Sequence, residues 1–143
     1  MTQLSSTLWQ YYQQSIFLLT QPFSPHSSFA IVTAFNPMGE NLSSCQNLLY
    51  DRRLQAEIDT MKVPYRSVIG ASPDLQHMEK SWALFCDIQS GLELGREFNQ
   101  LAIYYVDNGR LLLLPCLCSE DSIELGDFSA KAQLVSELPE LEF

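Results

Sequence analysis

The sequence is poor in positively charged side chains and has no long apolar run. Lysine and arginine number 8, against 17 aspartate and glutamate residues, so the formal net charge is −9. A surface of this sign repels phosphate groups, which disfavours direct binding to nucleic acid. The longest apolar runs, such as Ile16 to Leu19 and Leu111 to Leu114, are far shorter than the ~20 residues that span a bilayer. We therefore expect neither nucleic-acid binding nor a membrane span.

We expect neither a secretory leader nor a disulfide framework. The first basic residue is Arg52, so the N-terminus has no basic segment ahead of an apolar one, and we expect a cytoplasmic protein. Four cysteines are present, and in the cytosol such residues are more often small buried apolar side chains than disulfide partners. Cys116 and Cys118 would share one face of a strand, but neither a CxxC motif nor a histidine cluster accompanies them. We expect no metal site.

The common catalytic signatures are absent as well. The chain has no Walker sequence, no GxGxxG motif, no GxSxG motif and no HExxH motif, so we expect no cofactor, and the sequence assigns no reaction. A nucleophilic pair of Cys45, at a helix N-terminus, with His77 is one alternative. The simpler interpretation is that Cys45 is an ordinary residue of the first helical turn.

What is present fits one globular domain. Apolar residues make up 46% of the chain and charged residues 17%, and a chain of 143 residues is long enough for one core. The acidity is concentrated in residues 119–143, which hold seven acidic residues and only Lys131 as a base. We therefore divide the chain into an α+β domain at residues 1–118 and an acidic C-terminal extension at 119–143, packed on the domain or trailing from it.

The stretch FAIVTAFNP, residues 29–37, predicts a buried strand that stops at Asn36 and Pro37. Apolar spacing and capping residues predict helices over residues 5–19, 44–61 and 90–100, and a short one over 129–138. Further strands are predicted at residues 63–69, 79–86, 101–106 and 110–115, the last two joined by the turn DNG. This order favours a ferredoxin-like βαββαβ sheet with an extra C-terminal strand and an N-terminal helix.

Several motifs occur together in this order: LWQYYQQSIF, FAIVTAFNP, LSSCQNLLYDRRLQAEI, IGASPDLQHMEKSWAL and LELGREFNQLAIYYVDNGRLLLLPC. Over roughly residues 8 to 116 the chain resembles the bacterial family of domain of unknown function 3293. That family's pattern contains TAxNP, an early asparagine in the next helix, HxExS before a strand and a glutamine before another. Phe98, Asn99 and Gln100 stand where the family often has Phe-Gly-Gln. The resemblance implies an order of elements and a set of residues, but no activity.

Polar residues at the ends of the predicted elements define a candidate pocket at the end of the strand predicted in residues 29–37. Glu79 is the candidate general base, and His77 would face the same side. A helix N-terminus with inward amide groups favours a small polar or anionic molecule. The candidate ligand-binding residues are Thr33, Asn36, Asn47, Arg53, Ser81 and Gln100.

Two other interpretations stay open. The polar residues could only satisfy backbone groups at the strand ends, with Glu79 in a structural ion pair with Arg52 or Arg53. The second function, of a different class, is an interaction module in which the acidic extension binds a basic protein partner, and a more specific form of it is mimicry of nucleic acid. In its simplest form the extension only keeps the protein soluble.

Overall fold

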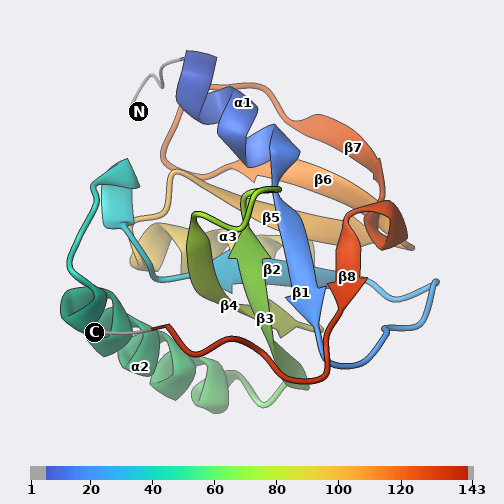
Figure 1. The fold of residues 1–143 in the computed structure, drawn as a ribbon, viewed down its shortest axis with the longest axis horizontal. Helices are drawn as coiled ribbons and strands as arrows, with labels where there is room; N and C mark the ends of the chain where they lie inside the picture. The colour runs from blue at the N-terminus through green and yellow to red at the C-terminus, as the bar shows by residue number, and fades with distance from the viewer. Residues whose placement is uncertain (1–5, 142–143) are drawn as a thin grey trace.

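The strand predicted from the stretch FAIVTAFNP lies in the middle of the sheet. The structure is a computed structural model that describes residues 6–141, and in it β2 (Phe29–Thr33) pairs with β4 (Met78–Leu84) and with β5 (Ala102–Asp107). The eight strands follow the order β7-β6-β5-β2-β4-β3-β1-β8 in one curled sheet (Figure 1). The other strands are β1 (Ile16–Leu19), β3 (Tyr65–Ala71), β6 (Arg110–Pro115), β7 (Ile123–Asp127) and β8 (Ala132–Leu134).

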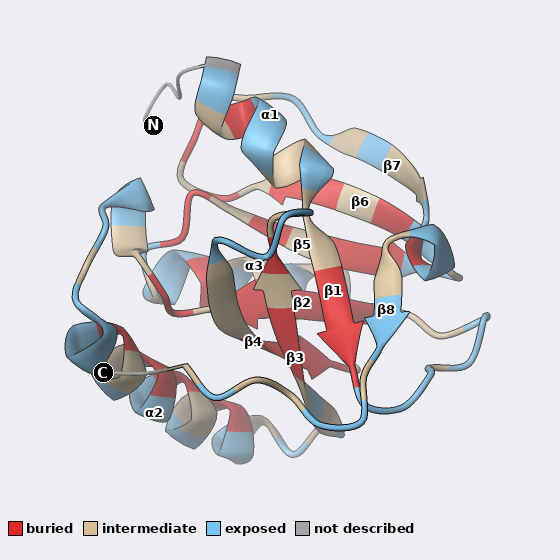
Figure 2. Cartoon of the chain, in the orientation of Figure 1, coloured by how far each residue is buried: buried red, intermediate tan, exposed pale blue. Residues whose placement is uncertain are grey.

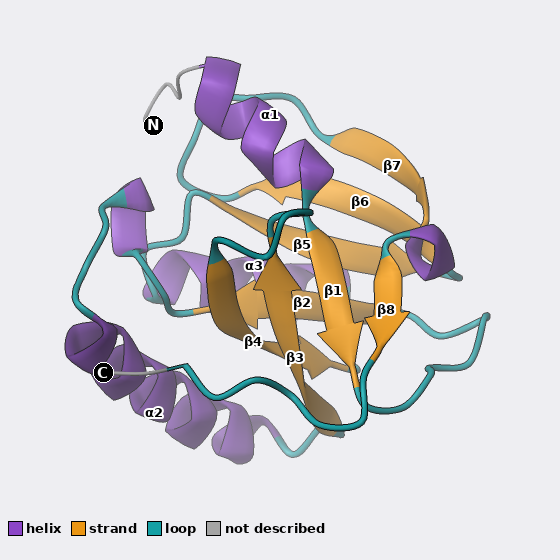
Figure 3. Cartoon of the chain, viewed as in Figure 1, coloured by secondary structure: helices purple, strands orange, loops and turns teal. Residues whose placement is uncertain are grey.

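The helices lie on both faces of the sheet. α2 (Ser44–Met61) and α3 (Ile88–Glu97) cover one face, whereas α1 (Ser6–Gln14) crosses the opposite face (Figure 3). Ser43 is the N-cap of α2: its hydroxyl accepts a hydrogen bond from the backbone N–H of Gln46, and the Gln46 side chain accepts one from the backbone N–H of Ser43. This capping box fixes where the helix starts, next to the end of β2.

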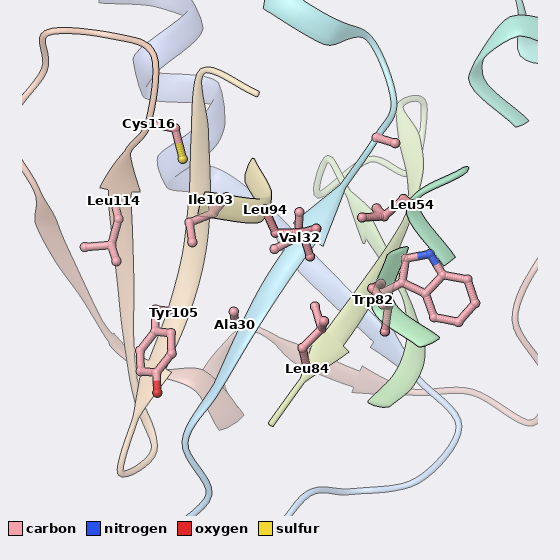
Figure 4. Packing of buried hydrophobic residues seen from close by; sticks show 12 residues of the cluster. Ala30, Val32, Leu54, Trp82, Leu84, Leu94, Ile103, Tyr105, Leu114 and Cys116 are labelled. Carbon is pink, nitrogen blue, oxygen red and sulfur yellow. The ribbon is translucent and has the colours of Figure 1, made fainter. Parts of the chain in front are cut away.

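The main core fills the space between the sheet and helices α2 and α3. Leu54 and Ile58 of α2 are fully buried. Leu94 of α3 belongs to the same cluster as Leu54 (Figure 4). The apolar residues of the central strands are correspondingly buried, while the outer side of α2 faces solvent (Figure 2). Strand alternation places Trp82 and Leu84 in this core. Their neighbours on β4 therefore point to the face that α1 covers.

The predicted β5–β6 hairpin is present. Asn108 and Gly109 both have positive φ, at 48° and 83°, as a tight two-residue turn requires. A Cβ on Gly109 would lie 2.5 Å from the carbonyl oxygen of Pro25, so only glycine fits at this position.

The prediction of one helix up to Leu19 is wrong, because the helix ends at Gln14 and Ile16–Leu19 forms β1. β1 is antiparallel to β3 and parallel to β8. Its last three residues, Phe17, Leu18 and Leu19, are all at most 3% exposed. A helix would expose part of such a run, whereas in the strand Phe17 and Leu19 enter one apolar cluster and Leu18 enters another on the opposite face.

The predicted helix over residues 129–138 is also wrong. A short 3-10 turn, η2 (Phe128–Ala130), leads into β8, which takes the open edge of β1. The backbone N–H of Phe17 donates to the carbonyl of Lys131, and that of Val135 donates to the carbonyl of Leu19. Strand β7 pairs with β6, so residues 123–127 and 132–134 belong to the sheet.

The protein is thus an α+β protein with three α-helices and an eight-stranded curled sheet across the described residues. Within residues 6–141, no helix has the length and apolar character that crossing a membrane requires.

Candidate functional site

The site is built around Asn36, three residues after the end of β2. Asn36 has a left-handed backbone conformation, with φ 50° and ψ 57°. Asparagine adopts this conformation more readily than most residues because its short polar side chain bonds locally. Pro37 then starts the 3-10 turn η1 (Pro37–Gly39), so the chain cannot continue the strand.

Asn47, in the first turn of α2, holds both the backbone and the side chain of Asn36. The backbone N–H of Asn36 donates to Asn47 Oδ1 at 2.8 Å, and Asn47 Nδ2 donates to Asn36 Oδ1 at 2.9 Å. The backbone N–H of Leu42 donates to the same Asn36 oxygen at 3.0 Å. With two donors on its oxygen, the Asn36 amide has a fixed orientation, and its NH₂ group points the other way.

That NH₂ group meets Glu79, which lies near the start of β4. Asn36 Nδ2 donates to Glu79 Oε2 at 2.9 Å. Glu79 is partly buried, and desolvation raises the pKa of its carboxyl to about 7, while the hydrogen bond from Asn36 acts in the opposite direction. Among the described residues Glu79 forms no ion pair, so the structural pair with Arg52 or Arg53 is absent there.

Two tyrosines lie near Glu79 on the face covered by α1. Burial and the charge of Glu79 both raise the pKa of Tyr12, on α1, and of Tyr104, on β5. The Tyr104 hydroxyl donates to the carbonyl of Tyr12 and lies 2.8 Å from Ser15 Oγ. Both phenols therefore stay protonated at neutral pH, and the Tyr104 hydroxyl ties the end of α1 to the sheet.

Three other predicted residues bond the backbone around this point. Thr33 Oγ1 donates to the carbonyl of Lys80 at 2.7 Å, and Ser81 Oγ donates to the carbonyl of Glu79 at 3.2 Å. Gln100 Nε2 donates to the carbonyl of Phe35 at 3.2 Å. The structure thus brings these residues together around the end of β2, in contacts with main-chain groups.

Two predicted residues lie elsewhere. His77 is exposed in the connection between β3 and β4, where its backbone N–H donates to Ser72 Oγ at 3.0 Å. Arg53 is exposed on α2, with its guanidinium 5.5 Å from the centre of the Tyr50 ring.

Sequence reasoning missed a buried polar group on the other side of β4. Asp51 is 2% exposed, accepts a hydrogen bond from Trp82 Nε1 at 2.8 Å and pairs with Lys80 Nζ at 3.1 Å. The signal was available, because Asp51 follows Asn47 by four residues and so lies on the same inward stripe of α2. This group joins α2 to β4 and thereby fixes the position of Asn47.

The arrangement can exchange a proton and bind a polar group. The carboxyl of Glu79 has a pKa of about 7. Its Oε2 accepts a hydrogen bond from the oriented Asn36 amide, and its Oε1 accepts none from any described residue. Across residues 6–141, no three histidine, cysteine, aspartate or glutamate side chains are grouped so as to hold a metal ion.

Fold and site together define a small α+β protein with a polar network at the end of its central strand. The model of the family described as "Protein of unknown function (DUF3293)" matches residues 32–103, half of the chain, and the chain belongs to this family. The matched segment contains every predicted site residue and leaves out α1, β1 and β6 to β8. Comparisons with curated proteins and with solved structures gave no match.

Proposed function

We propose that this protein binds a small polar or anionic metabolite at the end of β2, and that Glu79 exchanges a proton with it. The observation that carries this proposal is the Glu79 carboxyl, whose pKa lies at about 7 while one of its oxygens is held by the oriented Asn36 amide. A group with a pKa near the working pH is present in both forms, so it can give or take a proton. The protonated form also donates a hydrogen bond to a carbonyl or an anion.

The geometry supports a built site over a purely structural role. Asn36 adopts a conformation that costs most non-glycine residues free energy, and three hydrogen bonds hold it there. A network that only satisfied the backbone would not need an unpaired carboxylate that is partly buried, because burial without a charge partner is unfavourable. Strained backbone and perturbed carboxylates are both enriched at functional sites.

The test is a thermal-shift measurement on a panel of small carboxylates, amides and polyols at pH 6 and pH 8. The variants are Glu79→Gln and, as a matched control, Glu93→Gln, since Glu93 is an exposed glutamate on α3. We expect at least one compound to stabilise the wild type and the control more than Glu79→Gln. If no compound stabilises the wild type, or if all three proteins respond alike, the proposal fails.

We also propose that residues 29–107 form a ferredoxin-like unit within the larger sheet. The strand order β5-β2-β4-β3, with antiparallel neighbours and both connecting helices on one face, supports this assignment. The acidic interaction module has less support. Two of the seven carboxylates of its segment, Glu124 and Asp127, pair with Arg110 of the neighbouring strand.

A further inference from the structure

A second candidate site lies on the helical side of the molecule, separate from Glu79. A surface cavity of about 340 Å³ that is open to solvent is lined by η1, by the middle of α2 and by the end of α3. Its volume is in the range of pockets that hold small molecules. Its lining residues are Pro37, Tyr50, Arg53, Glu57, Glu97, Phe98 and Asn99.

The charges around this cavity are of both signs and are not paired with one another. Arg53 comes from α2, while Glu57 follows one turn later and Glu97 ends α3. None of the three forms an ion pair within residues 6–141. Glu97 also stands at a helix C-terminus, where the helix dipole favours a cation. The cavity therefore offers one place for an anionic group and another for a cationic group.

The remaining wall is apolar. Tyr50 and Phe98 are partly buried and pack against the main core, so their rings are held in place. The Tyr50 ring also lies under the Arg53 guanidinium, a cation–π contact that holds the charged group over the cavity wall. An apolar substituent of a ligand would contact these two rings.

We infer that this cavity binds a free amino acid with an apolar or aromatic side chain. Its carboxylate would pair with Arg53, its ammonium group with Glu97 or Glu57, and its side chain would pack on Tyr50 and Phe98. A purely anionic ligand would be repelled by the two glutamates, and a purely cationic one would leave the Arg53 guanidinium without a partner.

The experiment uses the full chain and NMR titration with L-phenylalanine and two matched derivatives. N-acetyl-L-phenylalanine lacks the ammonium group, and L-phenylalaninamide lacks the carboxylate. We expect L-phenylalanine to shift the amide signals of residues lining the cavity, and both derivatives to bind at least tenfold more weakly. Absence of shifts with millimolar L-phenylalanine, or equal binding of the three compounds, would overturn the inference.

Variants locate the binding. Arg53→Gln and Glu97→Gln change exposed side chains, so both should fold, and each should weaken L-phenylalanine binding at least tenfold. Arg52→Gln is the matched control, because Arg52 is exposed on the same helix but does not line the cavity. Binding that is unchanged in Arg53→Gln contradicts this site. Because Glu79 does not line the cavity, Glu79→Gln should bind L-phenylalanine normally, which separates this inference from the function proposed above.

Discussion

Replacing Glu79 by glutamine should make the protein more stable at alkaline pH and leave it nearly unchanged at acidic pH. Glutamine has almost the same shape, and its side-chain oxygen can still accept the hydrogen bond that Asn36 Nδ2 donates to Glu79 Oε2. The substitution therefore removes the charge while keeping the contact. What changes is the pH dependence of the free energy of unfolding, because the variant has no carboxyl whose pKa differs between the folded and unfolded states.

The magnitude follows from the shift in pKa. In the unfolded chain the carboxyl titrates at its ordinary pKa of 4.5, whereas in the folded protein burial raises the pKa to about 7. Between these values the folded state binds more protons than the unfolded state, so the free energy of unfolding of the wild type falls as the pH rises. Each pKa unit corresponds to about 1.4 kcal/mol, so the loss for this group between about pH 4 and pH 8 is at most ~3 kcal/mol.

The assay is urea unfolding of the wild type and Glu79→Gln at a series of pH values across this range. The variant lacks the titrating group, so its stability relative to the wild type should rise by about 2 to 3 kcal/mol from the acidic to the alkaline end. Glu93→Gln should show no such trend. A difference between Glu79→Gln and the wild type that stays constant with pH would refute the reasoning.

Three further predictions concern the asparagines that hold this carboxyl and the packing of α3. Asn36→Gly keeps the left-handed backbone but removes the donor to Glu79, so an NMR titration should give a pKa for Glu79 above 7. Asn47→Ala leaves the backbone N–H of Asn36 without its acceptor, so urea unfolding should show a free energy of unfolding lower by about 2 to 4 kcal/mol. The control is Asn41→Ala, at an exposed position, which should change the free energy of unfolding by less than about 0.5 kcal/mol. Gly95→Ala would place a Cβ 2.6 Å from a side-chain carbon of β5, so calorimetry should show a lower Tm, with a cost of about 1 to 3 kcal/mol, despite the better helix propensity of alanine.

The central part of the fold could be predicted because local signals agree there with the three-dimensional arrangement. The serine cap and apolar stripe of α2, the DNG hairpin and the polar end of β2 each specify one structure. The two ends of the chain could not be predicted in this way. Ile16–Leu19 and residues 132–134 are too short for their periodicity to distinguish helix from strand, and their pairing depends on strand edges far away in sequence.

In the candidate site, too, some residues could be predicted from the sequence and others could not. Asn36, Asn47 and Glu79 were selected because polar residues at the ends of elements stand out from an apolar pattern, and the structure brings them into direct contact. Tyr12 was not selected as a site residue, and its proximity to Glu79 depends on where α1 crosses the opposite face. That crossing follows from the change from helix to strand after Gln14, which sequence spacing did not reveal.

The central claim is that Glu79 carries a carboxyl that titrates near neutral pH. The most direct measurement is a carbon-13 NMR titration of the side-chain carboxyl carbons, with the Glu79 signal assigned by its absence in Glu79→Gln. The account predicts a midpoint close to 7 for this signal. A midpoint at or below the ordinary value of 4.5 would contradict it.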